Sequence, residues 1–135
     1  MDDELPIVEF GFPGPLRERL LTAIKSGEKT STSSLMREYD VSDDRLPFVG
    51  HRGAVIDSDG QRVFVIETTG VDVVRLGDVP LDHAVAEGEG YSSVAEWRAA
   101  HEKFWSSAET RAELGSDFEP YDDTLVVLER FTVIE

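Results

Sequence analysis

The residues best suited to chemistry lie in one hydroxyl-rich segment, residues 27–33 (GEKTSTS), where a threonine follows a lysine after three positions. A threonine hydroxyl is a poor nucleophile until a base takes its proton, and a lysine can be that base if burial or a neighbouring cation lowers its pKa. Lys29 and Thr32 therefore predict nucleophilic chemistry, on the condition that the chain bends there. In a straight strand, side chains three positions apart point to opposite faces.

A carboxylate can complete this chemistry by holding an attacking water or by protonating a leaving amine. Glu87 is a candidate, although it lies far from Lys29 in the sequence and only the fold can bring the two together. His83 precedes Glu87 by four positions, a spacing that can ligate a metal ion. Two ligands do not make a site, so we interpret His83 and Glu87 as a pair on a helix surface and predict no metal site.

Each of the three candidates also has a structural interpretation. Lys29 can complement the C-terminus of a preceding helix, Thr32 can be an edge-strand residue, and Glu87 can be a solvated side chain beside a glycine turn. Aromatic residues at helical spacing favour a core over a base-stacking surface, which applies to Trp97, Phe104 and Trp105 and to His101 between them.

The elements that must position these residues are helices and short strands. Apolar residues at 16, 20, 21 and 24 predict a helix that ends at Gly27, and the hydroxyl-rich segment after it is predicted to be extended. Residues 34–50 lack clear periodicity and predict a long loop. Residues 53–57 and 62–69 form a predicted hairpin around an Asp-Gly turn, and residues 71–76 predict a further strand.

The C-terminal half continues with helices and a strand. A short helix is predicted at 81–87, and Ser93 with Glu96 has capping-box spacing for a helix through Trp105. A closing strand is predicted at 124–134. Strand runs with inserted helices predict an α+β class, with a small β-barrel and flanking helices in a single domain over residues 1–135.

Composition narrows the function classes. The 135 residues contain no cysteine, which excludes thiolate zinc sites and a cysteine nucleophile, and no apolar run is long enough to predict a membrane span. The net charge of −15 argues against long duplex nucleic acid. The charge is uneven, because residues 17–52 carry seven basic against six acidic residues. An acidic N-terminus without a leader pattern predicts a cytoplasmic protein.

Three segments in order resemble the ASCH domain family, whose β-barrel is shared with the PUA RNA-binding fold. The resemblance covers about Leu16 to the C-terminus and rests on a G-x-K-x-x-T motif at 27–32, the hairpin ending at 65–74, and residues 83–98 with the final strand through Phe131. An arginine two residues after the motif threonine is usual in the family, and Ser34 stands there, with Arg37 nearby.

This resemblance implies an RNA- or nucleoside-related role. Compact family members hydrolyse the amide of N4-acetylcytidine with a Lys, a Thr and a Glu, whose positions match Lys29, Thr32 and Glu87. Longer members with a helical insert, like the one around Trp97, are associated with RNA binding and metal-assisted RNA cleavage. No cofactor is expected. A divalent metal ion is expected only if the protein is a ribonuclease.

We therefore expect a cleft that binds RNA or a modified nucleoside, and we favour hydrolysis of the bound molecule. In that reaction Lys29 is expected to be the base, Thr32 the hydroxyl partner and Glu87 the acid–base group. The expected substrate contacts are Gly27, Ser33, Arg37, Tyr91 and Arg98. The alternatives are a non-catalytic RNA- or nucleotide-binding module and a protein-interaction domain. No membrane or duplex DNA partner is expected, and the oligomeric state is left open.

Overall fold

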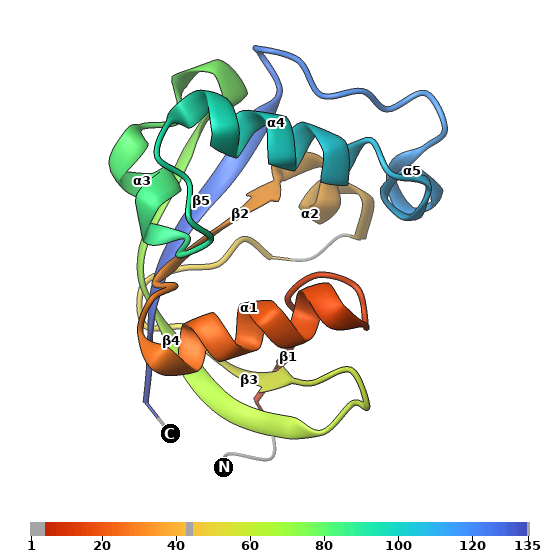
Figure 1. Ribbon diagram of the computed structural model, residues 1–135. Coiled ribbons are helices and arrows are strands. Elements are labelled where there is room, and N and C mark those ends of the chain that lie inside the picture. The colour runs from red at the N-terminus through yellow and green to blue at the C-terminus, as the bar shows by residue number, and fades with distance from the viewer. Residues whose placement is uncertain (1–4, 43–44, 135) are drawn as a thin grey trace.

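The computed structural model describes residues 5–42 and 45–134 and consists of one mixed sheet with helices on it (Figure 1). The strand order is β1-β3-β4-β5-β2, with β1 parallel to β3 and the other pairs antiparallel. The predicted α+β class is confirmed. The elements are β1 (Ile7–Val8), α1 (Pro15–Ser26), β2 (Ser31–Leu35), α2 (Met36–Ser42), β3 (Arg52–Ile56), β4 (Arg62–Arg75), a short 3₁₀ helix (Leu76–Asp78), α3 (Leu81–Ala86), α4 (Val94–Trp105), α5 (Ala108–Leu114) and β5 (Leu125–Val133).

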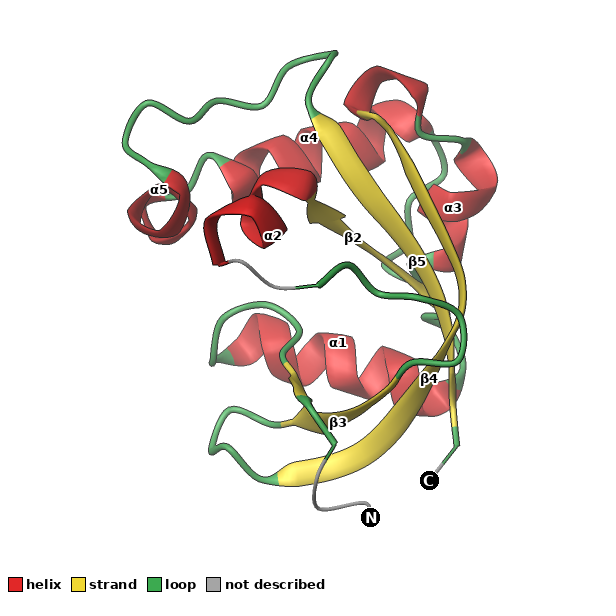
Figure 2. Cartoon of the chain, turned by 180° about the vertical axis from the view of Figure 1, so that it is seen from behind, coloured by secondary structure: helices red, strands yellow, loops and turns green. Residues whose placement is uncertain are grey.

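Two apolar cores hold the helices against the sheet. The first joins α1 to β3, β4 and β5, and its members include Leu20, Ile24, Val55 and Phe131. The second joins α3, α4 and α5 to β2 and β5 around the fully buried Trp97. The view from behind shows α1 with β3 in one half and α2, α3, α4 and α5 in the other, with β4 and β5 spanning both (Figure 2).

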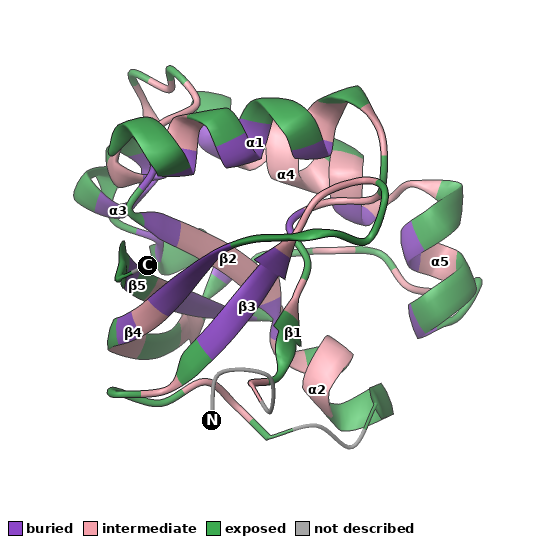
Figure 3. Cartoon of the chain, turned by 90° about the horizontal axis from the view of Figure 1, so that it is seen from below, coloured by how far each residue is buried: buried purple, intermediate pink, exposed green. Residues whose placement is uncertain are grey.

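The local signals in the sequence set several boundaries. Gly27 ends α1 in the left-handed conformation, as glycine without a Cβ does readily. Ser93 caps α4 by accepting a hydrogen bond from the Glu96 N–H. The buried stripe of α1 and the buried middle of β3 are visible in Figure 3, and the helical spacing of apolar residues in α1 predicts its stripe.

Two expectations about elements are wrong. Residues 34–50 are not one loop, because β2 continues to Leu35 and α2 follows at once; residues 43 and 44 of this stretch lie outside the described residues. No side chain of α2 is buried, so it lacks an apolar stripe, and Glu38 instead fixes its start by accepting from the Leu35 N–H. Residues 71–76 are not a separate strand, because β4 runs on through an irregularity between Thr68 and Gly70.

Helix α5 has no counterpart among the predicted elements. Ser107 caps this helix by accepting from the Thr110 N–H. Among the described residues, every helix is too short or too polar to cross a membrane.

Candidate functional site

A cleft of about 1420 Å³ lies between α1 on one side and α2 and α4 on the other, with β2 contributing to its lining. Lys29, Thr32 and Glu87 all line it, together with Ser33 and Tyr91. The three residues matched to the family motif thus share one cleft, although they come from separate parts of the chain.

The turn after α3 brings Glu87 to Lys29. The Thr30 N–H donates to the Ala86 carbonyl at 2.8 Å, which ties the start of β2 to the end of α3. Gly88 packs against the backbone of residue 28 so closely that a Cβ there would lie 2.3 Å from the Glu28 carbonyl oxygen. Its φ of +69° also favours glycine. Any side chain at residue 88 would push Glu87 away from the lysine.

The Lys29 side chain is 2% exposed, and its ammonium group lies among acceptors. Its Nζ donates to the Ser31 carbonyl at 2.8 Å and to the Glu87 carbonyl at 3.4 Å. It also forms ion pairs with Glu87 Oε1 at 3.6 Å and with Glu89 Oε2 at 3.9 Å. This environment holds the lysine in place as a cation.

Glu87 is 1% exposed, and both of its carboxylate oxygens are engaged. Oε2 accepts from the Ser33 hydroxyl at 2.6 Å and from the Trp97 indole N–H, while Oε1 faces His101 Nε2 at 3.1 Å. Burial alone would raise the pKa of Glu87, but hydrogen bonds from His101 and His83 and the charge of Lys29 outweigh it and hold that pKa far below its usual range. Glu87 is therefore a fixed carboxylate.

Two expectations about this carboxylate are consequently wrong. His83 is also 1% exposed, so His83 and Glu87 are a buried pair and not a surface pair. The interpretation of Glu87 as a solvated residue fails for the same reason.

His101 is a further partner of Glu87. Its Nδ1 lies 2.8 Å from the Trp97 carbonyl, and its Nε2 faces Glu87 Oε1 at 3.1 Å. The ring also stacks on Trp97 with centroids 4.3 Å apart. Packing in the helix, as predicted, is thus only part of what His101 does.

His83 and Ser33 do not form a hydrolase triad with Glu87. The Ser33 hydroxyl lies 2.7 Å from His83 Nε2, and Glu87 contacts the same ring nitrogen. In a triad, the carboxylate binds the other nitrogen of the imidazole. Here the buried His83 Nδ1 has no hydrogen-bond partner within the described part of the chain. We interpret His83 as a group that fixes Ser33 and Glu87.

Thr32 lies on the opposite face of β2 from Ser31 and Ser33. Strand β2 is regular through Thr32. Lys29 precedes this strand, and its ammonium group donates to the Ser31 carbonyl. The Thr32 hydroxyl has no hydrogen-bond partner among residues 5–42 and 45–134, so it is available to a bound molecule.

Glu89 and Tyr91 follow Glu87 on the same turn and line the cleft. Burial raises the pKa of Glu89 despite the nearby Lys29 charge. Burial, with the charges of Glu89 and Glu87, raises the pKa of Tyr91 to about 12, so its phenol stays a hydrogen-bond donor. Tyr91 is half-buried and lies at the cleft, where it can stack on a ring or donate to one.

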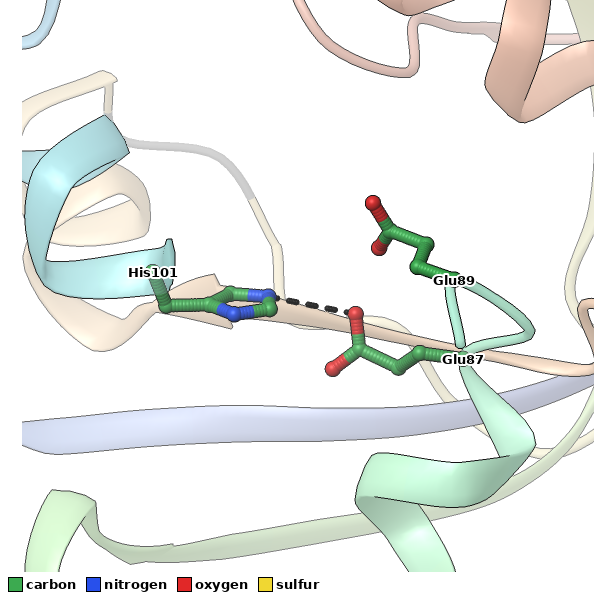
Figure 4. Close-up of side chains that lie close together, drawn as sticks. All are labelled: Glu87, Glu89 and His101. Carbon is green, nitrogen blue, oxygen red and sulfur yellow. Dashed lines mark hydrogen bonds and ion pairs between the residues drawn. The ribbon is translucent and has the colours of Figure 1, made fainter. Parts of the chain in front are cut away.

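Glu87, Glu89 and His101 lie close enough to suggest a metal site. Glu87 projects from the end of α3 and Glu89 from the turn after it, and Glu87 points at His101 on α4 (Figure 4). One ligand atom from each lies within 4.8 Å of the others. However, the Lys29 ammonium already supplies positive charge at both carboxylates. A divalent ion there would have to share these groups with a buried cation, so the donor set does not favour one.

Three predicted substrate contacts lie elsewhere. Arg37 donates to the Leu114 carbonyl at 2.9 Å and lies over the Phe118 ring. Arg98 pairs with Asp122 at 2.6 Å. Neither arginine is among the residues that line the cleft, and Gly27 lies at a separate small hollow behind α1. The sequence patterns paired His83 with Glu87 but did not reveal Trp97 and His101 as partners of Glu87, because only the fold brings α4 to the end of α3.

The comparisons with known proteins agree with this architecture. A family model of the ASCH domain matches residues 7–135, and the chain belongs to this family, which has a PUA-like fold and is often linked to RNA binding. No curated protein matches the chain.

Solved structures resemble it closely. The ASCH domain of Lactobacillus crispatus JV V101 is 34% identical with a TM-score of 0.78, over 95% of this chain and 79% of that one. Protein EF3133 of Enterococcus faecalis V583 is 28% identical with a TM-score of 0.82, over 96% and 76% of the two chains. A ZmASCH mutant protein of Zymomonas mobilis shares the fold at 10% identity, with a TM-score of 0.51, over 96% and 71% of the two chains.

Proposed function

We propose that this protein hydrolyses the exocyclic amide of an acylated nucleoside, of the N4-acetylcytidine type, in the cleft between α1 and α4. The observation that carries the proposal is the buried Lys29–Glu87 ion pair at a cleft that also presents the unpaired hydroxyl of Thr32. A fixed cation and a free hydroxyl that line one cleft suit acyl transfer, because negative charge develops on the acyl oxygen as the hydroxyl attacks.

The roles follow from the contacts. Thr32 is the nucleophile, and Lys29 stabilises the developing oxyanion. Lys29 is not the base in this proposal, because its ammonium already donates to two carbonyls and pairs with two carboxylates. Glu87 holds Lys29 and His101 and transfers no proton, since both its oxygens are occupied.

A small neutral substrate fits better than an RNA strand. The chain carries a net charge of −15, and the arginines expected to contact a substrate, Arg37 and Arg98, are bound outside the cleft. Ring recognition by Tyr91 and His101, by contrast, needs no net charge.

Amide chemical shifts of the isotope-labelled protein test where and what it binds. Titration with cytidine or N4-acetylcytidine is expected to shift signals of β2, of the turn at 87–91 and of His101 on α4. A short single-stranded RNA is expected to bind more weakly in the presence of salt. If the RNA binds more tightly and shifts signals on other faces, a non-catalytic RNA-binding module is the better account.

A further inference from the structure

Among the carboxyl groups that line the cleft is one on the sheet that the motif does not include. Glu129 on β5 is in register with Thr32 on β2, and both residues line the cleft. Residues paired in this way project from the same face of an antiparallel sheet, with Cβ atoms roughly 4.5–5.5 Å apart. Glu129 is thus the nearest neighbour of Thr32 on its own face, whereas Glu87 contacts Ser33 on the other face.

A third residue orients this carboxyl group. The Thr68 hydroxyl donates to Glu129 Oε2 at 2.6 Å. Thr68 is 2% exposed, and its own backbone is fixed by hydrogen bonds with His51 and Gly50, each of 2.8 Å. The other oxygen, Oε1, has no partner among the described residues and is free to accept a proton.

The surroundings of Glu129 contrast with those of Glu87. Burial raises the pKa of Glu129 by more than the Thr68 hydrogen bond and the facing His51 lower it. A carboxyl group whose pKa moves toward neutral pH can accept a proton and release it again. Two carboxyl groups in one cleft with pKa values displaced in opposite directions usually divide the roles between them.

We propose that Glu129 is the proton-transfer residue of this site, serving as general base to Thr32 and then as general acid to the leaving nitrogen. This inference rests on the proposed function and adds its missing base. Thr32, Glu129 and Thr68 then stand in the order nucleophile, base and orienting group, as in other activated hydroxyl sites.

Protons are conserved in both steps, the acylation of Thr32 and the hydrolysis of the resulting ester. As Thr32 Oγ bonds to the acyl carbon, its proton moves to Glu129, and as the carbon–nitrogen bond breaks, the same proton passes to the leaving amine. Water then attacks the threonine ester, giving one proton to Glu129 while its oxygen bonds to the acyl carbon. The carbon–Oγ bond breaks, and Glu129 returns that proton to Thr32.

The test uses Glu129→Gln and Glu129→Ala in the full chain with N4-acetylcytidine. Glutamine can still accept from Thr68, so the fold is expected to survive. Both variants are expected to lose about 10²- to 10⁴-fold in kcat, the usual contribution of a general base, with little change in KM. Formate is expected to restore part of the activity of Glu129→Ala, whose cavity admits it, and none to Glu129→Gln. Glu67→Gln, at an exposed ion pair with Arg52, is the control and keeps its activity.

The outcomes separate the two claims. Rescue by formate supports proton transfer by Glu129, because a structural role would not respond to a small carboxylate. Full activity of Glu129→Gln, or a folded Glu129→Ala that formate does not rescue, overturns the inference alone. If the wild type releases no acetate at all, the proposed function fails and the inference falls with it.

Discussion

Replacing Glu87 by alanine is expected to destabilise the protein by about 3–5 kcal/mol, because it leaves a buried cation without its main partner. Of its two carboxylate partners, Lys29 would keep only Glu89, which is half-buried and 3.9 Å away. The Trp97 indole N–H and the Ser33 hydroxyl would lose their acceptor as well. A domain of this size has about 5–15 kcal/mol of stability, so the variant would be close to unfolding.

Denaturant unfolding of Glu87→Ala and Glu87→Gln measures this effect. Glutamine preserves the volume but removes the negative charge that pairs with Lys29, so most of the loss is expected to remain. The matched control is Glu67→Ala at the exposed pair with Arg52, where less than about 1 kcal/mol is expected. A Glu87→Gln protein within about 1 kcal/mol of the wild type would contradict the role of this ion pair.

The contacts of Glu87 also determine in which direction the free energy of unfolding changes with pH. The folded-state pKa of Glu87 is lowered, so its contribution to stability is complete above its unfolded pKa of about 4.3. That contribution is lost as the pH falls below this value. The difference in unfolding free energy between the wild type and Glu87→Gln is therefore expected to be constant near neutral pH and to narrow in acid.

Replacing Thr32 by valine is expected to abolish hydrolysis while leaving the fold intact. The hydroxyl has no partner among the described residues, so its loss leaves no buried group unpaired. Loss of the nucleophile is expected to lower kcat for N4-acetylcytidine by roughly 10³-fold or more. Thr32→Ser keeps the hydroxyl and is the matched control, with kcat expected near the wild-type value.

Acetate release by the two variants shows whether the Thr32 hydroxyl takes part in hydrolysis. Thermal unfolding measured in parallel shows whether both variants are folded. A Thr32→Val protein that turns over as fast as Thr32→Ser would show that the hydroxyl takes no part in the reaction.

Local signals predicted much of the fold. The Gly27 end of α1, the hairpin of β3 and β4 and the Ser93 cap of α4 each depend on residues close together in the sequence, which is why composition and spacing were sufficient. Helix α2 was missed because none of its residues is buried, so its sequence carries no apolar period. The resemblance to the ASCH family led to Lys29, Thr32 and Glu87, which line one cleft as expected.

The environment of the site depends on long-range contacts that no spacing reveals. Burial of Glu87 requires Gly88 to pack on residue 28, and the helical spacing of His83 and Glu87 is equally compatible with a surface. The register of β2 on β5 places Glu129 beside Thr32 across almost a hundred positions of sequence. Only the fold shows that the carboxylate of Glu87 is fixed by its contacts and that the carboxyl group of Glu129 has a free oxygen.

Acetate release from N4-acetylcytidine by the purified wild-type protein shows whether this cleft is hydrolytic, with Thr32→Val as the matched blank. Steady multiple turnover is expected from the wild type without added metal, and none from the variant above the uncatalysed rate. No acetate from the wild type, or equal release from both proteins, would contradict the assignment of this cleft as a hydrolytic site for acylated nucleosides.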